Sequence, residues 1–179
     1  MVLVHKEEIK SDFKGTIIDL ETIGSFNSFS DSRRYKKIIP VIFGYINSKG
    51  LNILCAKNQE SIQTLKAQIL ELIGKLDKPF YAFNTDFERG VLFHHLSKHI
   101  EFEEELNKEV FEKKEDLVRA LKIPSYDDPF HGDGKSCMMA WLKGDIEKAI
   151  KHNRSCLLKE RDILLKRGSR KPDELKFVK

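Results

Sequence analysis

Apolar residues in the first third of the chain gather in short, β-branched runs that are separated by polar turns. Gly15–Ile23 closes at Gly24, Ile38–Ile46 follows a polar loop, and Leu51–Ala56 follows the turn Asn47–Gly50. Short runs of this composition predict strands. Because the connections between them are also short, we expect an antiparallel meander.

The spacing of apolar residues becomes helical after Asn58, which is suited to cap a helix. Apolar positions recur every three or four residues from Asn58 to about Leu76 and again over Phe87–His99, which predicts two amphipathic helices. Between them, Pro79–Asn84 is a compact apolar run that predicts a strand. Strands alternating with helices indicate the α/β class.

The second half of the chain is rich in charge and in loop-forming residues. Glu101–Lys114 is a dense charge run and predicts a solvated helical face or a mobile excursion. Pro124–Gly134 predicts a long irregular loop, and loops of this length are often functional. We expect two more helices, near Ser136–Leu142 and over about Asp145–Arg167, with Gly168 as the cap of the second.

The length and the ends of the chain favour one domain over residues 1–179. A chain of 179 residues with 40% hydrophobic residues can bury a core without disulfides or structural metal. Met1–Lys10 reads as a polar lead-in, the core as about 13–167, and 168–179 as a charged, poorly ordered tail.

Charge and cysteine content narrow the class of protein. The 32 basic and 28 acidic residues leave a net charge of +4, which permits a polyanionic partner without requiring one. Three cysteines cannot pair completely and none has a zinc-motif spacing, so we expect reduced thiols and a cytoplasmic protein. No apolar run approaches the roughly 20 residues of a membrane span, so we expect no membrane partner.

Asp19 and Glu21 are the first candidates for chemistry. They lie two residues apart on a predicted strand, so their carboxylates point to the same side while Leu20 points to the other. Such a pair repels unless a cation neutralises it, and Mg²⁺ or Mn²⁺ prefers oxygen ligands. The alternative is an edge strand whose acidic residues face water.

The segment DLETIG, residues 19–24, resembles motif I of the DEDD exonucleases, the proofreading group within the RNase H-like superfamily. FNTDFERGVL is similar to motif II of that group, with Asn84, Phe87 and Gly90 matching and the acid falling on Glu88; Asp86 remains a rival ligand. The resemblance covers roughly residues 13–167. It implies an RNase H-like mixed sheet, in which three antiparallel strands are followed by parallel strands and helices flank the sheet.

Motif III of the group is incomplete in this chain. His152 takes the place of the tyrosine or histidine, but Cys156 or Leu157 stands where an aspartate is required. His152 and Cys156 lie one helical turn apart on one face, so both would reach the pocket, the imidazole as a base and the thiol as a poor Mg²⁺ ligand. Glu160 and Asp162 would replace the missing acid only on a rotated or distorted helix.

The resemblance implies a 3′-5′ exonuclease, a hydrolase that uses two Mg²⁺ or Mn²⁺ ions to cut DNA or RNA at a single-stranded end. Asp19 would bridge both ions, Glu21 would hold the nucleophile-side ion, and Glu88 would support the other. His152 would orient or deprotonate the attacking water. Because Cys156 replaces an acid, we expect weak activity that favours Mn²⁺, or none.

Several residues are candidates for binding the strand. Phe26 and Phe29 lie among basic residues just after motif I, where they could stack bases while the cations contact phosphates, or form an ordinary basic surface loop. The expected substrate-binding residues are Thr22, Asn84, Phe87, Arg33 and Arg34. The alternative function is a catalytically inactive module that binds nucleic acid or a protein through the same fold.

Overall fold

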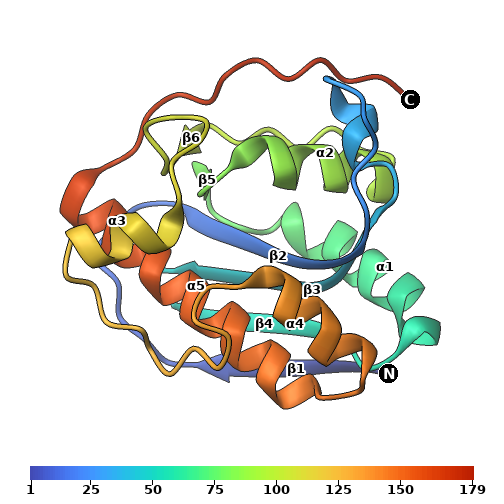
Figure 1. The fold of residues 1–179 in the computed structure, drawn as a ribbon, viewed down its shortest axis with the longest axis horizontal. Coiled ribbons are helices and arrows are strands. Elements are labelled where there is room, and N and C mark those ends of the chain that lie inside the picture. The colour runs from blue at the N-terminus through green and yellow to red at the C-terminus, as the bar shows by residue number, and fades with distance from the viewer.

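The computed structural model describes residues 1–179 and has an α/β architecture with a six-stranded mixed sheet and five α-helices (Figure 1). The predicted α/β class is therefore confirmed. The sheet has the strand order β1-β4-β3-β2-β5-β6. Its strands are β1 (Val2–Glu7), β2 (Thr16–Gly24), β3 (Ile38–Asn47), β4 (Gly50–Ala56), β5 (Phe80–Ala82) and β6 (Glu104–Glu105).

Strand β2 lies inside the sheet and pairs in opposite directions with its two neighbours. It is antiparallel to β3, which is antiparallel to β4, so the predicted meander is confirmed. It is parallel to β5, which is parallel to β6. A strand with neighbours on both sides and helices on both faces is apolar along most of its length. Ile17 and Ile18, which point to opposite faces, are both fully buried.

Helices cover both faces of the sheet. α1 (Ile62–Ile73) and α2 (Thr85–Leu96) pack on one face, and α4 (Gly134–Leu142) and α5 (Ile146–Arg167) pack on the other (Figure 1). The short helix α3 (Lys114–Ala120) lies beside α5. Two 3-10 helices complete the fold, η1 (Ser32–Tyr35) and η2 (Gln59–Ser61).

Two edge strands differ from the sequence-based expectation. The predicted polar lead-in contains β1, which pairs with β4. The charge run that we expected to be solvated contains β6, in which Glu105 is buried and accepts a hydrogen bond from the Thr85 hydroxyl. A short edge strand has a neighbouring strand on one side only and buries few of its side chains. Its sequence therefore shows little apolar periodicity.

The charged tail also differs from the expectation of poor order. It runs as an extended segment from the end of α5 across β6 and α2 to the loop that carries η1 (Figure 1). Arg170 pairs with Glu105 at one end of this segment. At the other end, Ser32 N donates to Lys176 O at 3.0 Å, and Val178 N donates to Ser32 Oγ at 2.8 Å. The tail therefore links two distant edges of the molecule.

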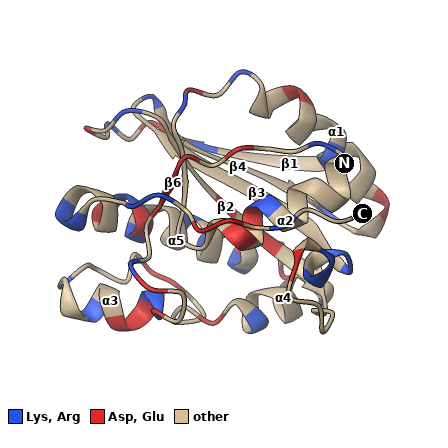
Figure 2. Cartoon of the chain, turned by 90° about the horizontal axis from the view of Figure 1, so that it is seen from above, with Lys and Arg blue, Asp and Glu red and all other residues tan.

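No helix has the length and apolar character needed to cross a membrane. Basic and acidic residues are interspersed over helices and loops (Figure 2).

Candidate functional site

Strand β2 places two carboxylates under α5. Asp19 and Glu21 are each 8% exposed, and they point to the same face while Leu20 is buried on the other. The amide of Asn153 on α5 donates to Asp19 Oδ2 at 2.7 Å and lies 3.5 Å from Glu21 Oε1. The structure therefore places the pair inside the protein, and they do not face bulk water as residues of an exposed edge strand would.

The first turn of α2 adds a third carboxylate. Glu88 is 5% exposed, and its Oε2 atom is buried without a hydrogen-bond partner. Burial, together with the charges of Asp19 and Glu160, raises the pKa of Glu88 well above its ordinary value. Asp86, the rival ligand, instead pairs with Arg89 at 2.5 Å; neither Asp86 nor Glu88 is among the residues that line the cavity described below. Of the two candidates, Glu88 is the one that faces Asp19.

Helix α5 adds a fourth carboxylate, Glu160, which is completely buried. His152, Cys156 and Glu160 follow one another at intervals of four residues, so they lie on one face of an undistorted helix. Glu160 therefore comes near Asp19 and Lys114 on an undistorted helix, although it does not line the cavity. Asp162 points elsewhere and bonds to Tyr126. Burial, with the charge of Asp19 adding to it, raises the pKa of Glu160 to about 8.

A lysine from α3 enters this group of acids. The ammonium of Lys114 lies 2.5 Å from Glu160 Oε1 and 3.6 Å from Asp19 Oδ1. Burial alone would lower the pKa of Lys114, but the charges of Cys156, Glu160 and Asp19 raise it well above its ordinary value. The pocket therefore holds a permanent positive charge that neutralises part of the carboxylate cluster.

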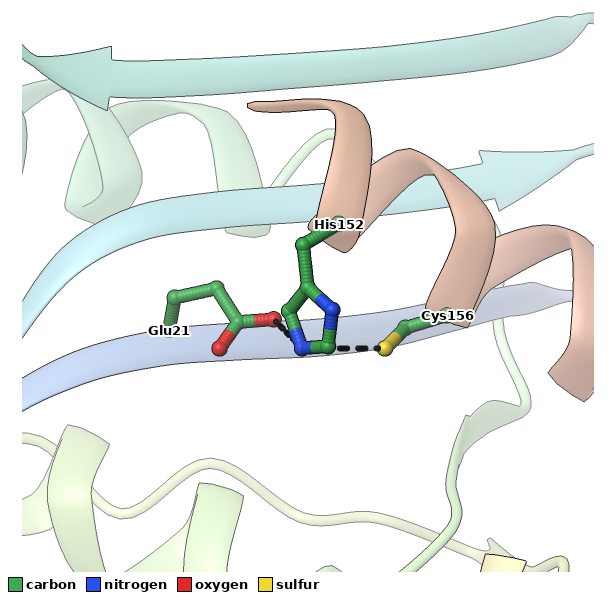
Figure 3. Close-up of side chains that lie close together, drawn as sticks. All are labelled: Glu21, His152 and Cys156. Atoms are coloured by element: carbon green, nitrogen blue, oxygen red, sulfur yellow. Dashed lines mark hydrogen bonds and ion pairs between the residues drawn. The ribbon is translucent and has the colours of Figure 1, made fainter. Parts of the chain in front are cut away.

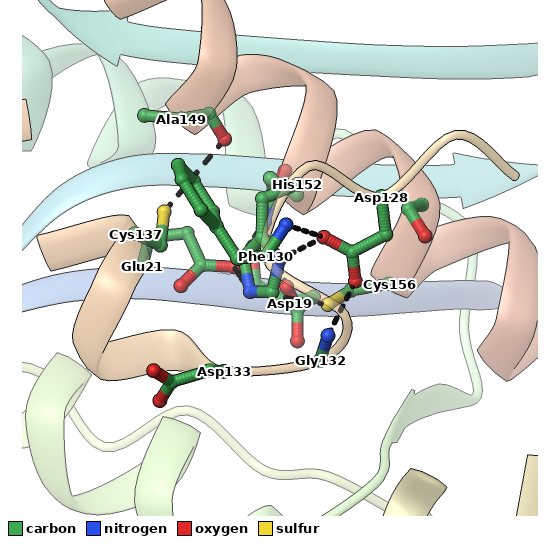
Figure 4. A network of polar contacts seen from close by, with 12 residues as sticks. Asp19, Glu21, Asp128, Phe130, Gly132, Asp133, Cys137, Ala149, His152 and Cys156 are labelled. Atoms are coloured by element: carbon green, nitrogen blue, oxygen red, sulfur yellow. Dashed lines mark hydrogen bonds and ion pairs between the residues drawn. The ribbon is translucent and has the colours of Figure 1, made fainter. Parts of the chain in front are cut away.

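His152 is held in place by Asp128 (Figure 4). Its Nδ1 atom lies 2.8 Å from Asp128 Oδ1, and Asp128 Oδ2 accepts hydrogen bonds from Lys159 Nζ at 3.0 Å and Gly132 N at 2.8 Å. Burial alone would lower the pKa of His152, but Cys156 and the hydrogen bond with Asp128 raise it to about 11. The same hydrogen bond, against the effect of burial, holds the pKa of Asp128 well below its usual range.

Glu21, His152 and Cys156 meet beside this pair (Figure 3). His152 Nε2 lies 3.7 Å from Glu21 Oε1 and 3.7 Å from Cys156 Sγ. Burial, assisted by the charge of Asp19 and opposed by His152, raises the pKa of Glu21 to about 7. These three side chains offer one oxygen, one nitrogen and one sulfur atom to a single point.

Asp19 and Glu21 line a cavity of about 580 Å³, whereas Glu88 and Glu160 are buried outside its lining. Phe26, Phe87 and Met138 supply apolar wall, and Thr22 and Lys135 supply polar wall. This volume is in the range of sites that bind small molecules or single nucleotides.

The predicted strand-binding residues are divided by the fold. Thr22 and Phe87 line the cavity, whereas Asn84 is the N-cap residue of α2 and lies outside it. Arg33 pairs with Asp31 and lies over the Phe29 ring at 4.1 Å, away from the cavity. The guanidinium of Arg34 lies 5.1 Å from the centre of the Phe26 ring, which brings it near the mouth of the cavity.

Sequence reasoning missed three polar side chains of the site. Lys114 closes a run of charges in which no lysine differs from its neighbours. Asp128 is one of several aspartates in an irregular loop, and its pairing with His152 depends on tertiary structure. Asn153 could have been found, because it directly follows His152 and is a polar residue in a helix that covers a sheet.

No protein family matches this chain, and no curated protein or solved structure is significantly similar to it. The candidate function therefore rests on the residues of the pocket.

Proposed function

We propose that this chain is a metal-dependent phosphodiesterase of the RNase H-like exonuclease type, which removes nucleotides from the 3′ end of a DNA or RNA strand. The observation that carries the proposal is the convergence of four buried carboxylates around the interior strand β2. They are Asp19 and Glu21 from β2, Glu88 from α2 and Glu160 from α5. Four acids in one desolvated space are costly unless cations join them.

The sheet supports the proposal. Strands β2, β3 and β4 are antiparallel, and β5 and β6 follow as parallel neighbours of β2. The resemblance to the RNase H-like superfamily implies this arrangement of β2 to β6, but not the additional antiparallel strand β1 beside β4. Glu160 supports it too, because it supplies a fourth acid where Cys156 had left motif III incomplete.

The residues of the pocket fit divalent ions such as Mg²⁺ or Mn²⁺. Glu88 and Glu160 each have a buried carboxylate oxygen without a partner, so both can accept a further ligand. When bound, such ions supply charge stabilisation of the phosphate and a lower pKa of the attacking water. Asp19 would be shared between ions, Glu21 would face the attacking side, and Lys114 would withdraw from Asp19 and Glu160.

The remaining side chains of the pocket would position water and strand. Asp128 fixes the ring of His152, so its Nε2 atom faces the cavity beside Glu21 and, as an imidazolium, can orient a water or phosphate oxygen by donating a hydrogen bond. Phe26 and Phe87 offer aromatic surface at the cavity on which a terminal base could stack.

The test is degradation of end-labelled single strands with Mg²⁺ or Mn²⁺. We expect the native chain to release nucleotides and both Asp19→Ala and Glu88→Gln to lose this activity. Asp86→Asn is the matched comparison, because Asp86 lies on the same turn of α2 but pairs with Arg89. Equal residual cleavage by the native chain and Asp19→Ala would remove the enzyme proposal.

Lys114 favours a second candidate, a binding module that does not cleave. Its ammonium already contacts Glu160 and approaches Asp19, so the pocket can be held together without an added cation. Such a module would bind single strands equally well in chelator and in Mn²⁺ and would leave them intact. Strand binding that requires divalent ions would argue against it.

A further inference from the structure

The point between Glu21, His152 and Cys156 has the dimensions of a metal site. The three ligand atoms lie within 4.8 Å of one another, and the two contacts of His152 Nε2 are 3.7 Å each. Ligands of a tetrahedral zinc ion are separated by roughly 3.3–3.6 Å, given bond lengths of about 2.0–2.3 Å. Shifts of a few tenths of an ångström would therefore close these two pairs around one ion.

The ligand atoms select the class of cation. A thiol sulfur and an imidazole nitrogen suit Zn²⁺ and its neighbours in the transition series, whereas Mg²⁺ prefers oxygen alone. Glu21 adds the carboxylate oxygen that zinc also accepts. Glu21 is thus shared by two neighbouring ligand sets: an all-oxygen set with Asp19, Glu88 and Glu160, and a mixed oxygen, nitrogen and sulfur set with His152 and Cys156.

The contact between Asp128 and His152 is a second, independent observation that points to a cation. A histidine that binds a metal through one ring nitrogen commonly gives its other N–H to a carboxylate, which fixes the ring. Asp128 takes this role at Nδ1 and is itself held by the amide of Gly132 (Figure 4). The ammonium of Lys159 also donates to Asp128 Oδ2. The ring is therefore oriented so that Nε2 points at Glu21 and Cys156.

We propose that Glu21, His152 and Cys156 bind one thiophilic divalent cation of the Zn²⁺ class, with Asp128 as the positioning residue. The fourth coordination position opens into the cavity of about 580 Å³, where water or a phosphate oxygen can enter. Any catalytic role of this cation rests on the proposed phosphodiesterase function, but its binding does not.

The contacts from Cys156 to His152 and from His152 to Asp128 also allow an alternative, a catalytic triad. In it Cys156 would be the nucleophile, His152 the base and Asp128 the acid that orients the base. The surroundings disfavour that alternative, because a thiolate here would face the carboxylates of Asp19 and Glu21. Burial and the charge of Asp19 raise the pKa of Cys156 more than the nearby charges of Lys114 and His152 lower it. A bound cation reverses this preference by stabilising the thiolate directly.

The experiment is a Co²⁺ titration of the full, reduced chain after treatment with a chelator. We expect one Co²⁺ per chain with thiolate-to-cobalt charge-transfer absorption, which equimolar Zn²⁺ removes and excess Mg²⁺ does not. Cys156→Ser should lose this absorption. Cys55→Ala is the matched control and should keep it, because Cys55 is buried in β4 and bonds to Ala56. Asp128→Asn should weaken Co²⁺ binding by roughly 10–100-fold.

X-ray absorption of the zinc-loaded native chain gives the same answer without any variant. We expect one sulfur neighbour at about 2.3 Å beside nitrogen and oxygen. A zinc coordination shell without sulfur would overturn the proposed site. So would thiolate-to-cobalt charge-transfer absorption that survives in a folded Cys156→Ser variant. Rapid alkylation of Cys156 that saturating Zn²⁺ does not slow would overturn it as well, in favour of the nucleophile.

The two proposals fail separately. Cobalt–thiolate absorption in a chain that cleaves no strand keeps the cation site and rejects the phosphodiesterase. Mg²⁺-dependent cleavage that Asp19→Ala abolishes, in a chain without cobalt–thiolate absorption, keeps the phosphodiesterase and rejects the cation site.

Discussion

The ammonium of Lys114 lies 2.5 Å from Glu160 Oε1, so the chain supplies a positive charge of its own to a pocket of buried acids. The same nitrogen lies 3.6 Å from Asp19 Oδ1. One charge offsets only part of the repulsion among four carboxylates. A divalent cation that enters between Asp19 and Glu160 must therefore compete with Lys114 for the same oxygens.

Replacing Lys114 by methionine should tighten Mn²⁺ binding by about tenfold, equivalent to roughly 1.4 kcal/mol, because the competing charge is gone. In chelator the variant should be less stable than the native chain, since it leaves buried carboxylates without their cation. Calorimetric titration with Mn²⁺ and thermal unfolding measure the two effects. Lys113→Met, at the exposed neighbouring position, is the control and should change neither. Weaker Mn²⁺ binding by a folded Lys114→Met would show that Lys114 assists the cation.

The stability of the cation-free protein should fall as the pH rises from about 4.5 to 8. A glutamate in the unfolded chain ionises near pH 4.5, whereas the folded-state pKa is about 7 for Glu21 and about 8 for Glu160. Over this window the folded state therefore holds more protons than the unfolded state, so deprotonation favours unfolding, by an amount on the order of a few kcal/mol. His152 acts in the same direction above pH 6.5, because its folded-state pKa is about 11.

Thermal unfolding between pH 4.5 and 8 in chelator measures this slope. Saturating Mn²⁺ or Zn²⁺ should flatten or reverse it, because a cation replaces the protons on the acids. A Tm that rises steadily over the same range in chelator would contradict the raised pKa values of the cluster.

Gly44 should tolerate no side chain. It lies opposite Asp19 on β3, and a Cβ atom there would be 2.0 Å from Asn153 Oδ1 and 2.9 Å from Leu157 Cδ1. Gly44→Ala would push α5 away from the sheet and break the hydrogen bond from Asn153 to Asp19. Overpacking of this kind costs about 1–3 kcal/mol, so we expect a lower Tm and weaker divalent binding. Gly74→Ala is the matched control, because a Cβ there meets nothing within 4 Å.

Substitution of two exposed phenylalanines, one at the cavity and one away from it, tests whether a base of the bound strand stacks on the cavity wall. Phe26 is 54% exposed and lines the cavity, whereas Phe29 is 44% exposed and does not. Each lies beside an arginine, and Phe26 also contacts the rings of Tyr35 and Phe87. Phe26→Ala should weaken binding of a single strand by about 1–3 kcal/mol, the effect of losing one stacked base. Phe29→Ala should leave the affinity unchanged; equal losses in a fluorescence anisotropy titration would exclude stacking on Phe26.

The local periods of the sequence predicted much of what the fold brings together. Asp19 and Glu21 share a face because a strand repeats every two residues, and His152 and Cys156 share one because a helix repeats nearly every four. Strands and helices near the centre of the chain were found with small shifts at their ends, since their apolar patterns are long. These rules act within one element, so they remain valid whatever packs against it.

Contacts between elements could not be predicted in this way. Lys114 reaches Glu160 across 46 positions of sequence, and Asp128 reaches His152 across 24. Neither pair has a spacing that a helix or strand imposes. The strand β6 was missed for a related reason, because its buried Glu105 depends on the Thr85 hydroxyl and on Arg170, both far away in the chain.

The tail segment that ends on Ser32 has a consequence for how the protein is made. Ser32 belongs to the loop that follows β2, and its hydroxyl meets residue 178, which is synthesised 146 positions later. A ribosome releases these residues well after the sheet and helices α1 and α2 have emerged. The loop that carries Phe26 can therefore pack on Tyr35 and Phe87 before the tail is made, and the contacts of Ser32 with the tail close over a loop that already has its own anchors.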